Sequence, residues 1–313
     1  MYRLASRLVG PQDVSAFNAG PRERQTVKFE GALTAEEAAG LFDFNRLQQA
    51  ISGPGAPAAQ TDVYRVENLM RLSDIIKKSG TSALTAIQDL VRIGCTIRFR
   101  DVDQYDRDLA GFARSVAETY AADAQVNVYF TPPGQNGFPP HFDNSDAFII
   151  QVAGSKNWLI HSDYTESQEL PGPDVDWDPV RFRPVGPATP LILHAGDVLY
   201  IPRGVMHSAR CTDEASMHLT VSLTPLTMLG VLEMELRRLA AEDVALRRRV
   251  PWSVAGGAEE AAAAKRQLRK LLGRLGEKVN PSAAFEEKRA NLAKAAASQS
   301  NVFEEAVATM KAR

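Results

Sequence analysis

Between Val126 and Pro225 the chain is a succession of short β-rich runs broken by Gly, Pro, Asn and Asp. The runs read VNVYFT, AFIIQVAG, KNWLI, PLILHAGDVLYIP, HSARC and SMHLTVSL. Short strands separated by turn residues are typical of a sandwich or barrel of antiparallel strands. A polar insertion over residues 161–190 interrupts the series. The pattern therefore predicts a mainly β fold whose central part covers residues 126–225.

The segments on either side of this region have a helical texture. Residues 106–121 place four apolar side chains at helical spacing, namely Leu109, Phe112, Val116 and Tyr120. The residues after Leu226 are rich in Ala, Glu, Leu, Lys and Arg, which favours helices over 227–250 and 257–297. We therefore expect a mixed and helical N-terminal part (1–125), a barrel (126–225) and a C-terminal helical region (226–313).

Composition excludes several classes of protein. The 36 Lys+Arg and 38 Asp+Glu give a formal net charge of −2, which offers no global attraction to nucleic acid or membrane surfaces. No apolar run approaches the roughly 20 residues that span a bilayer, and the N-terminal segment lacks a long apolar stretch of the secretory type. Cys95 and Cys211 form no CxxC pair, which argues against a zinc ribbon or disulfide scaffold. We expect a cytoplasmic protein that binds neither nucleic acid nor membranes.

All five histidines lie inside the β region, and one of them has a carboxylate at a suggestive spacing. His141 and Asp143 occupy positions i and i+2 of PPHFDNSD, which share one face of a strand. His207, in IPRGVMHSA, is a candidate third ligand. Two histidines and one carboxylate form the facial triad of non-haem Fe(II) oxygenases. From spacing alone, a surface strand edge with an ordinary core histidine is an open alternative.

Three ordered segments carry a resemblance to a known family. They are VNVYFTPPGQNGFPPHFDNSDAFIIQVAGSKNWLI, GDVLYIPRGVMHSA and MHLTVSL. Together they resemble the JmjC-type cupin domain, closest to the ribosomal-oxygenase branch of the 2-oxoglutarate hydroxylases and related to the asparaginyl hydroxylase that acts on hypoxia-inducible factor. The resemblance implies a double-stranded β-helix (a jelly roll) with flanking helices. It also implies that His141, Asp143 and His207 bind Fe(II) and act as the catalytic centre.

The same resemblance implies a set of cosubstrate contacts. Lys156 follows Asp143 by thirteen residues, the family's register for the basic residue that holds the distal carboxylate of 2-oxoglutarate. Tyr129 and Ser222 match positions that help to hold the cosubstrate. Three further side chains share the polar faces of the same strands and are open between a cavity role and a structural one, namely Asn127, His218 and Thr220.

Other conspicuous residues receive no role at this stage. We interpret His161 and His194 as structural or exposed. Trp158 shares strand parity with Lys156, and either contact with the cosubstrate or ordinary core packing fits that position. The insertion 161–190 carries many acidic residues; it is either a solvated loop or an acidic lid that attracts a basic peptide.

The functional expectation is an Fe(II)- and 2-oxoglutarate-dependent dioxygenase that uses O2 to hydroxylate a side chain in a protein or peptide. A ribosomal protein and the precursor peptide of a natural product are both open as substrates. The alternatives are an N-methyl-lysine demethylase and a cupin that binds metal without catalysis. The apolar residues of the segment after Leu226 suggest a helical module through which two copies of the chain form a homodimer.

Overall fold

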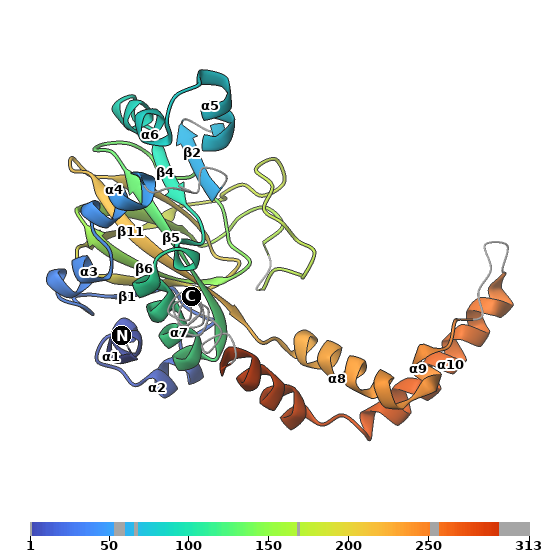
Figure 1. The fold of residues 1–313 in the computed structure, drawn as a ribbon. Helices are drawn as coiled ribbons and strands as arrows, with labels where there is room; N and C mark the ends of the chain where they lie inside the picture. Colours follow the sequence, from blue (N-terminus) through green and yellow to red (C-terminus); the bar gives the residue numbers. More distant parts are fainter. Residues whose placement is uncertain (1, 53–59, 66–67, 168–169, 251–256, 294–313) are drawn as a thin grey trace, which may run out of the picture. The chain divides into compact units, whose positions relative to one another are not determined.

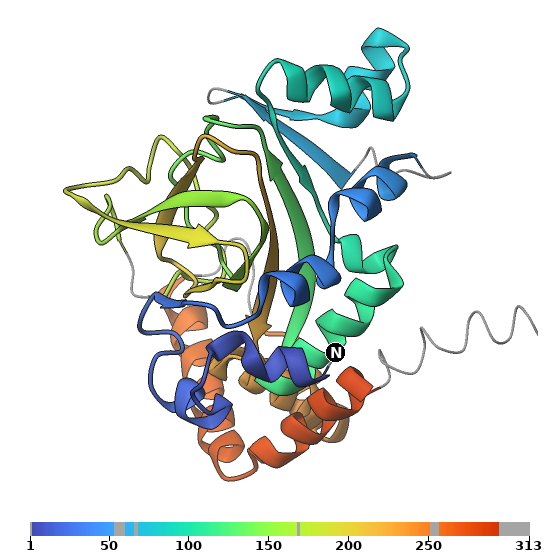
Figure 2. The same ribbon diagram turned by 90° about the vertical axis from the view of Figure 1, so that its left-hand side faces the viewer.

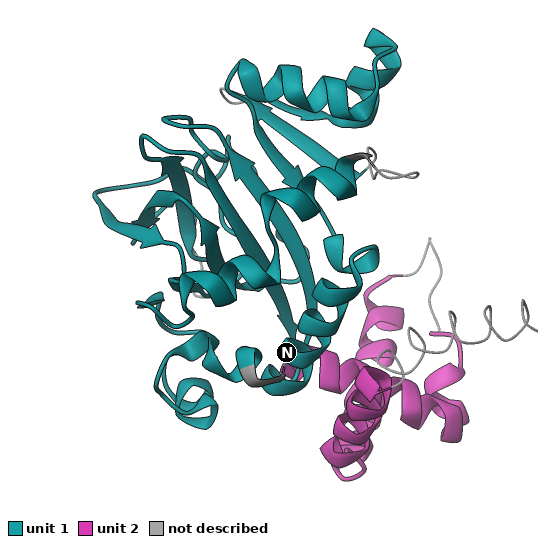
Figure 3. Cartoon of the chain, turned by 60° about the vertical axis from the view of Figure 1, so that its left-hand side comes forward, with its two compact units in different colours: residues 1–225 teal, residues 226–313 magenta. Residues whose placement is uncertain are grey.

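The computed structural model describes residues 2–52, 60–65, 68–167, 170–250 and 257–293. The chain divides into two compact units, residues 1–225 and residues 226–313 (Figure 3). Within the described ranges, no helix is both long enough and apolar enough to cross a membrane.

Two antiparallel sheets form the centre of the first unit (Figure 1). The larger sheet has the strand order β1-β9-β6-β11-β5-β4-β2-β3, and the smaller has the order β10-β7-β8. The strands of the larger sheet are β1 (Val27–Phe29), β2 (Thr61–Arg65), β3 (Asn68–Arg71), β4 (Thr96–Phe99), β5 (Ala122–Thr131), β6 (Asp146–Ala153), β9 (Val198–Ile201) and β11 (Ser216–Pro225). Those of the smaller sheet are β7 (Ser155–His161), β8 (Ala188–His194) and β10 (Met206–Cys211).

Strand β11 lies in the middle of the larger sheet and decides which residues face the interior of the barrel. It pairs with β5 on one side and with β6 on the other. Because side chains alternate along a strand, its residues separate into two sets. Leu219, Val221 and Leu223 are fully buried in the main hydrophobic core, on the helix-covered face of the sheet. His218 and Thr220 therefore point to the other face, toward the smaller sheet.

The two sheets are held together by a small apolar cluster. Ala147 and Ile149 of β6 and Leu199 and Ile201 of β9 pack there against Trp158 of β7, and Leu193 of β8 completes the cluster. Figure 2 shows the smaller sheet in yellow-green tones facing the longer strands of the larger one. This packing is the interior of a double-stranded β-helix, so the expected fold class is confirmed.

Helices cover the outer face of the larger sheet. They are α1 (Tyr2–Ala5), α2 (Val14–Ala19), α3 (Ala35–Leu41), α4 (Phe44–Ser52), α5 (Leu72–Ser79), α6 (Ala83–Arg92) and α7 (Arg107–Tyr120), with 3-10 turns η1 (Ser6–Val9) and η3 (Val102–Gln104). Helix α7 begins where the Asp106 carboxylate accepts hydrogen bonds from two backbone N–H groups of its first turn. Its four apolar residues that were predicted from helical spacing are all buried against the sheet.

The second unit is helical, with α8 (Met228–Glu242), α9 (Val244–Arg247), α10 (Ala258–Gly276) and a further helix over residues 281–293. The helices expected over 257–297 are thus α10 and the helix over 281–293, and residues 294–297 lie outside the described ranges. Between these two helices the chain contacts α8. The backbone N–H of Asn280 donates to the carboxylate of Glu235, a buried side chain of α8, at 3.0 Å. Arg238 also donates to this carboxylate, at 2.9 Å.

Candidate metal centre

The segment that carries His141 and Asp143 is not the continuous strand expected from the sequence. Only His141 makes strand-like backbone pairing, as an isolated bridge to His207. The His141 N–H donates to the His207 carbonyl at 3.0 Å, and the His207 N–H donates back at 2.8 Å. The Asp143 carbonyl accepts from Gly204 N–H, in the turn before β10, at 2.9 Å. The loop is therefore fastened to the strand that carries the third histidine.

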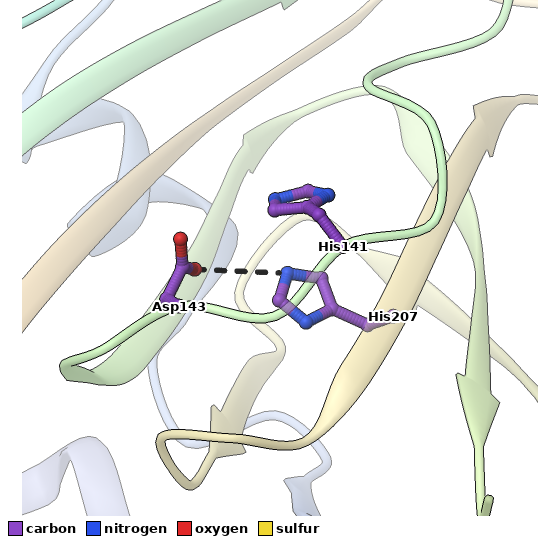
Figure 4. A group of neighbouring side chains, drawn as sticks. All are labelled: His141, Asp143 and His207. Carbon is purple, nitrogen blue, oxygen red and sulfur yellow. Dashed lines mark ion pairs between the residues drawn. The ribbon is translucent and has the colours of Figure 1, made fainter. Parts of the chain in front are cut away.

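The three side chains converge on one point (Figure 4). His141, Asp143 and His207 each offer one ligand atom, and these atoms all lie within 4.8 Å of one another. His207 Nε2 lies 3.8 Å from Asp143 Oδ2. These separations suit three ligands around a single ion, and two imidazoles with one carboxylate are the donor set of a non-haem iron site.

Hydrogen bonds fix which nitrogen of each imidazole is available. His141 Nδ1 lies 2.7 Å from the Pro139 carbonyl, and His207 Nδ1 lies 2.9 Å from the Val205 carbonyl. Because a carbonyl can only accept, each Nδ1 carries the proton and each Nε2 keeps its lone pair free for a metal. Burial, and then the neighbouring His141, lower the pKa of His207 to about 4, so this imidazole is neutral at physiological pH.

The three side chains open onto a cavity between the sheets, with a volume of about 430 Å³ that includes its solvent-filled mouth. Its lining combines the triad with one cation, one phenol and several aromatic rings. The lining residues are Tyr129, Gly137, Phe138, His141, Asp143, Ala147, Ile149, Lys156, Trp158, His207, Ser208, Ala209, His218 and Thr220.

Lys156 is the only cation among these lining residues, and its side chain is almost completely buried, with 1% exposed. Its Nζ donates to Thr131 Oγ1 at 3.0 Å. No ion pair joins it to a carboxylate in the described part of the chain. Burial lowers the pKa of Lys156 to about 8. A Cβ atom at Gly137 would lie 3.7 Å from this Nζ and 3.1 Å from the Ala209 carbonyl, so the glycine keeps the space beside the ammonium open.

Tyr129 lines the same cavity, and a hydrogen bond from Arg98 orients its hydroxyl group. The Arg98 guanidinium donates a hydrogen bond to it, and Arg98 is itself paired with the buried carboxylate of Asp62. Because the Tyr129 oxygen accepts from Arg98, its own proton is left to donate elsewhere. Burial raises the pKa of Tyr129, so the group remains a protonated phenol.

The other residues singled out in the sequence divide into two groups. Thr220 lines the cavity, whereas Asn127 and Ser222 are not among its lining residues. The side-chain oxygen of Asn127 instead accepts from Asp101 N–H at 3.0 Å. His161 is half-buried, with its Nε2 at 3.4 Å from Ser208 Oγ, and His194 is exposed.

Part of the insertion 161–190 packs against the metal centre. Trp177 lies edge-on to the His141 ring, with centroids 6.1 Å apart. Tyr164 and Phe182 pack around Phe142, the residue between two of the predicted ligands. Asn144 donates to the Val175 carbonyl at 2.7 Å, which ties the insertion to the loop that carries His141 and Asp143.

Sequence reasoning missed two supports of the site. Thr131 accepts the hydrogen bond of the Lys156 ammonium. It follows Tyr129 by two residues and so shares the face of β5 that carries Asn127 and Tyr129, which strand parity alone could have shown. Arg98, which orients Tyr129, comes from β4, and only the pairing of β4 with β5 brings the two together. The second contact has no local sequence signal.

Comparison with known proteins agrees with this geometry. Residues 96–230 match the JmjC domain model. This range includes all three predicted ligands and Lys156. The resemblance to the ribosomal-oxygenase branch is also confirmed. The chain is 31% identical over 186 residues to ribosomal oxygenase 1 of Gallus gallus, covering 56% of this chain and 30% of that protein.

A second relative has a broader name. A Drosophila simulans protein named bifunctional lysine-specific demethylase and histidyl-hydroxylase NO66 is 30% identical over 210 residues, which cover 64% of this chain and 24% of that one. The matched part of the chain thus spans less than a third of the length of either relative. Among solved structures, the ribosomal oxygenase YcfD from Escherichia coli, in complex with cobalt and succinic acid, superposes with a TM-score of 0.53. The superposition covers 89% of this chain and 69% of that one at 15% identity, and it shows a shared fold.

Proposed function

We propose that this chain is an Fe(II)- and 2-oxoglutarate-dependent oxygenase that hydroxylates an amino-acid side chain in a protein or peptide. The observation that carries the proposal is a single cavity that contains both a three-ligand metal centre and a buried ammonium without a carboxylate partner. The buried ammonium does not stabilise the fold, because a buried charge without a partner costs free energy. The two together match a metal ion and a dicarboxylate bound side by side.

The donor set fits iron. His141 and His207 each present Nε2, and Asp143 presents a carboxylate oxygen, all from a loop and strand that are hydrogen-bonded to each other. Two imidazoles and one carboxylate, with the remaining coordination positions open, are the facial triad of non-haem Fe(II) oxygenases. Three protein ligands would leave further positions for a bidentate 2-oxo acid and for O2.

The cation fits the other end of 2-oxoglutarate. Lys156 lies on β7, in the wall of the barrel, and its ammonium points into the interior. A carboxylate placed there would neutralise the charge and accept hydrogen bonds that Thr131 leaves unused. Tyr129 faces the same cavity with a proton to donate. We propose that Lys156, Tyr129 and Thr220 contact the cosubstrate. Asn127 and Ser222 would act indirectly, by supporting the strands that carry Tyr129 and Thr220.

The chemistry follows from this placement. Bound iron would couple the oxidative decarboxylation of 2-oxoglutarate to the insertion of one oxygen atom of O2 into a C–H bond of the substrate. The chain's own residues would orient the two reactants. Trp177 and Phe138 supply apolar walls beside His141.

The substrate is proposed as a side chain of a polypeptide, because the relatives' names refer to ribosomal oxygenation, histidyl hydroxylation and lysine demethylation. A ribosomal protein is the first candidate, and the precursor peptide of a natural product is the second. Hydroxylation of an N-methyl group would give a demethylase from the same centre.

The test begins with the metal and cosubstrate. Anaerobic Fe(II) protein titrated with 2-oxoglutarate should develop a visible metal-to-ligand charge-transfer band. If the protein binds Fe(II) but develops no such band, it is a non-catalytic cupin and the proposed function fails. Turnover against a peptide library from a cell lysate, read by mass spectrometry, should then show a gain of one oxygen atom. Net loss of a methylene group from methyl-lysine would identify demethylation instead.

We further propose that the helical unit mediates a homodimer. Leu229, Leu232 and Leu236 of α8 are each more than two-fifths exposed and lie at i, i+3 and i+7, on one stripe of the helix. An exposed apolar stripe of this kind marks an interaction surface. A second copy of the chain is the proposed occupant.

A further inference from the structure

His218 is a buried polar residue that the proposed function has not used. It lies in the middle of β11, and only 2% of it is exposed. Its Nδ1 is buried and has no hydrogen-bond partner among the residues that the structure describes. Because an unpaired polar atom in the interior costs free energy, such a group in a cavity wall points to a missing partner.

Aromatic contacts hold the imidazole in one orientation. The His218 ring stacks on that of Tyr129, its cross-strand partner, with centroids 4.7 Å apart and planes 9° from parallel. Trp158 approaches from β7, with its ring centroid 5.5 Å away and nearly perpendicular. A ring clamped on two sides is preorganised, so little conformational entropy is lost when it binds a ligand.

The strand register places His218 between the two ends of the cavity. Along β5 and β11, Thr131 pairs with Ser216, Tyr129 with His218, and Asn127 with Thr220. Thr131 holds the Lys156 ammonium, so His218 is one inward-facing position away from that level. Trp158, which contacts His218, has its ring 6.0 Å from Lys156 Nζ and 5.9 Å from the His207 ring.

The charge of the surroundings keeps this imidazole neutral. Burial, then Lys156, then His207 lower the pKa of His218 well below its usual value. A neutral imidazole has one N–H donor and does not repel the neighbouring ammonium. A neutral His218 can therefore lie beside the Lys156 ammonium, and both groups can donate to the same anion.

We propose that His218 donates a hydrogen bond to the distal carboxylate of the cosubstrate, beside Lys156, and is a specificity-determining residue for a dicarboxylic 2-oxo acid. The inference rests on the proposed function, because it takes 2-oxoglutarate as the ligand. A carboxylate offers about four lone-pair sites, more than one ammonium can fill, so a second donor from the opposite sheet has a free acceptor.

The test compares two substitutions at this position. His218→Phe keeps a flat ring for stacking on Tyr129 and removes the donor, whereas His218→Gln keeps a neutral N–H donor of similar reach. Both are loaded with Mn(II) and titrated calorimetrically with 2-oxoglutarate and with 2-oxopentanoate, which lacks the distal carboxylate. His218→Phe should raise the Kd for 2-oxoglutarate by about 10- to 100-fold, in line with a lost hydrogen bond to a charged group.

The controls separate this role from a structural one. His218→Gln should stay within about fivefold of the unmodified protein. The affinity of His218→Phe for Mn(II) and for 2-oxopentanoate should be unchanged. The inference is overturned if His218→Phe binds 2-oxoglutarate as tightly as the unmodified chain, or if it loses affinity for both acids by the same factor. If the unmodified chain binds Mn(II) but not 2-oxoglutarate, the proposed function itself fails.

Discussion

His141 and His207 are joined through their backbones, each donating its N–H to the carbonyl of the other at 3.0 and 2.8 Å. The pairing fixes the separation of the two imidazoles, whose centroids are 4.5 Å apart, before any metal is bound. Among the described residues no backbone carbonyl accepts from the Asp143 N–H, and the Asp143 side chain is 44% exposed. The centre therefore consists of two preset ligands and one carboxylate that is freer to adjust.

Asp143→Ala should remove the anionic ligand and leave the histidine pair intact. We expect metal affinity to fall by more than the 10- to 100-fold typical of a lost outer contact, and succinate release from 2-oxoglutarate to be abolished. The measurements are Fe(II) affinity under anaerobic conditions and succinate yield. Asp174→Ala, which removes an exposed carboxylate of the insertion, is the matched control and should change neither. Retained succinate release in Asp143→Ala would remove Asp143 from the metal centre.

Lys156→Met should stabilise the protein while it weakens the cosubstrate site. The folded pKa of about 8 lies below the usual 10.5, so the buried charge is a cost to folding at pH 7. Replacing it with an apolar side chain of similar length should raise the free energy of unfolding by roughly 1–3 kcal/mol. Denaturant unfolding at pH 7 checks this gain, and calorimetry should show at least a tenfold loss in 2-oxoglutarate affinity. A destabilised variant with normal affinity would contradict both expectations.

The stability that Lys156→Met gains over the unmodified chain should decrease as the pH rises above about 8. Above pH 8 the folded protein releases the Lys156 proton, whereas the unfolded chain holds it until about pH 10.5. The stability of the unmodified chain therefore rises across this window relative to that of Lys156→Met.

Binding of 2-oxoglutarate should weaken as the pH rises through about 8. The carboxylate pairs only with the charged ammonium, so the Kd of the unmodified protein should be flat below that pH and rise by about tenfold per unit above it. The measurement is calorimetric titration of the Mn(II) protein between pH 6.5 and about 9.5. Lys156→Arg keeps its charge throughout this range and should show no such rise. A flat profile in the unmodified protein would show that the Lys156 proton is not linked to binding.

Much of the central fold could be predicted because its signals are local. The alternation of β11 identified which residues face the core, and the apolar spacing of α7 identified its buried face. Strand β1, in contrast, has only three residues, Val27–Phe29, and is defined by its pairing with β9 some 170 residues later. A strand this short has no periodicity of its own, and its place in the sheet depends on tertiary pairing.

The site shows the same division between local and distant signals. The placement of Lys156 in the barrel interior agrees with the family register, but His141 and Asp143 converge through a loop bridged to His207 and not through strand parity. The orientation of Tyr129 depends on Arg98 and, behind it, on Asp62 of β2. Such contacts between three strands are set by the register of the sheet, and no short motif in the sequence encodes them.

The exposed stripe of α8 leads to a prediction about assembly. Leu232 and Leu236 are 46% and 42% exposed, and an apolar stripe of this kind is stable in water when a partner covers it. The double variant Leu232→Glu/Leu236→Glu should therefore convert a homodimer to a monomer, measured by sedimentation equilibrium at micromolar concentration. Arg237→Glu, an exposed change on the same helix outside the stripe, should leave the dimer intact. A monomeric unmodified chain, or a double variant that still dimerises, would exclude α8 as the interface.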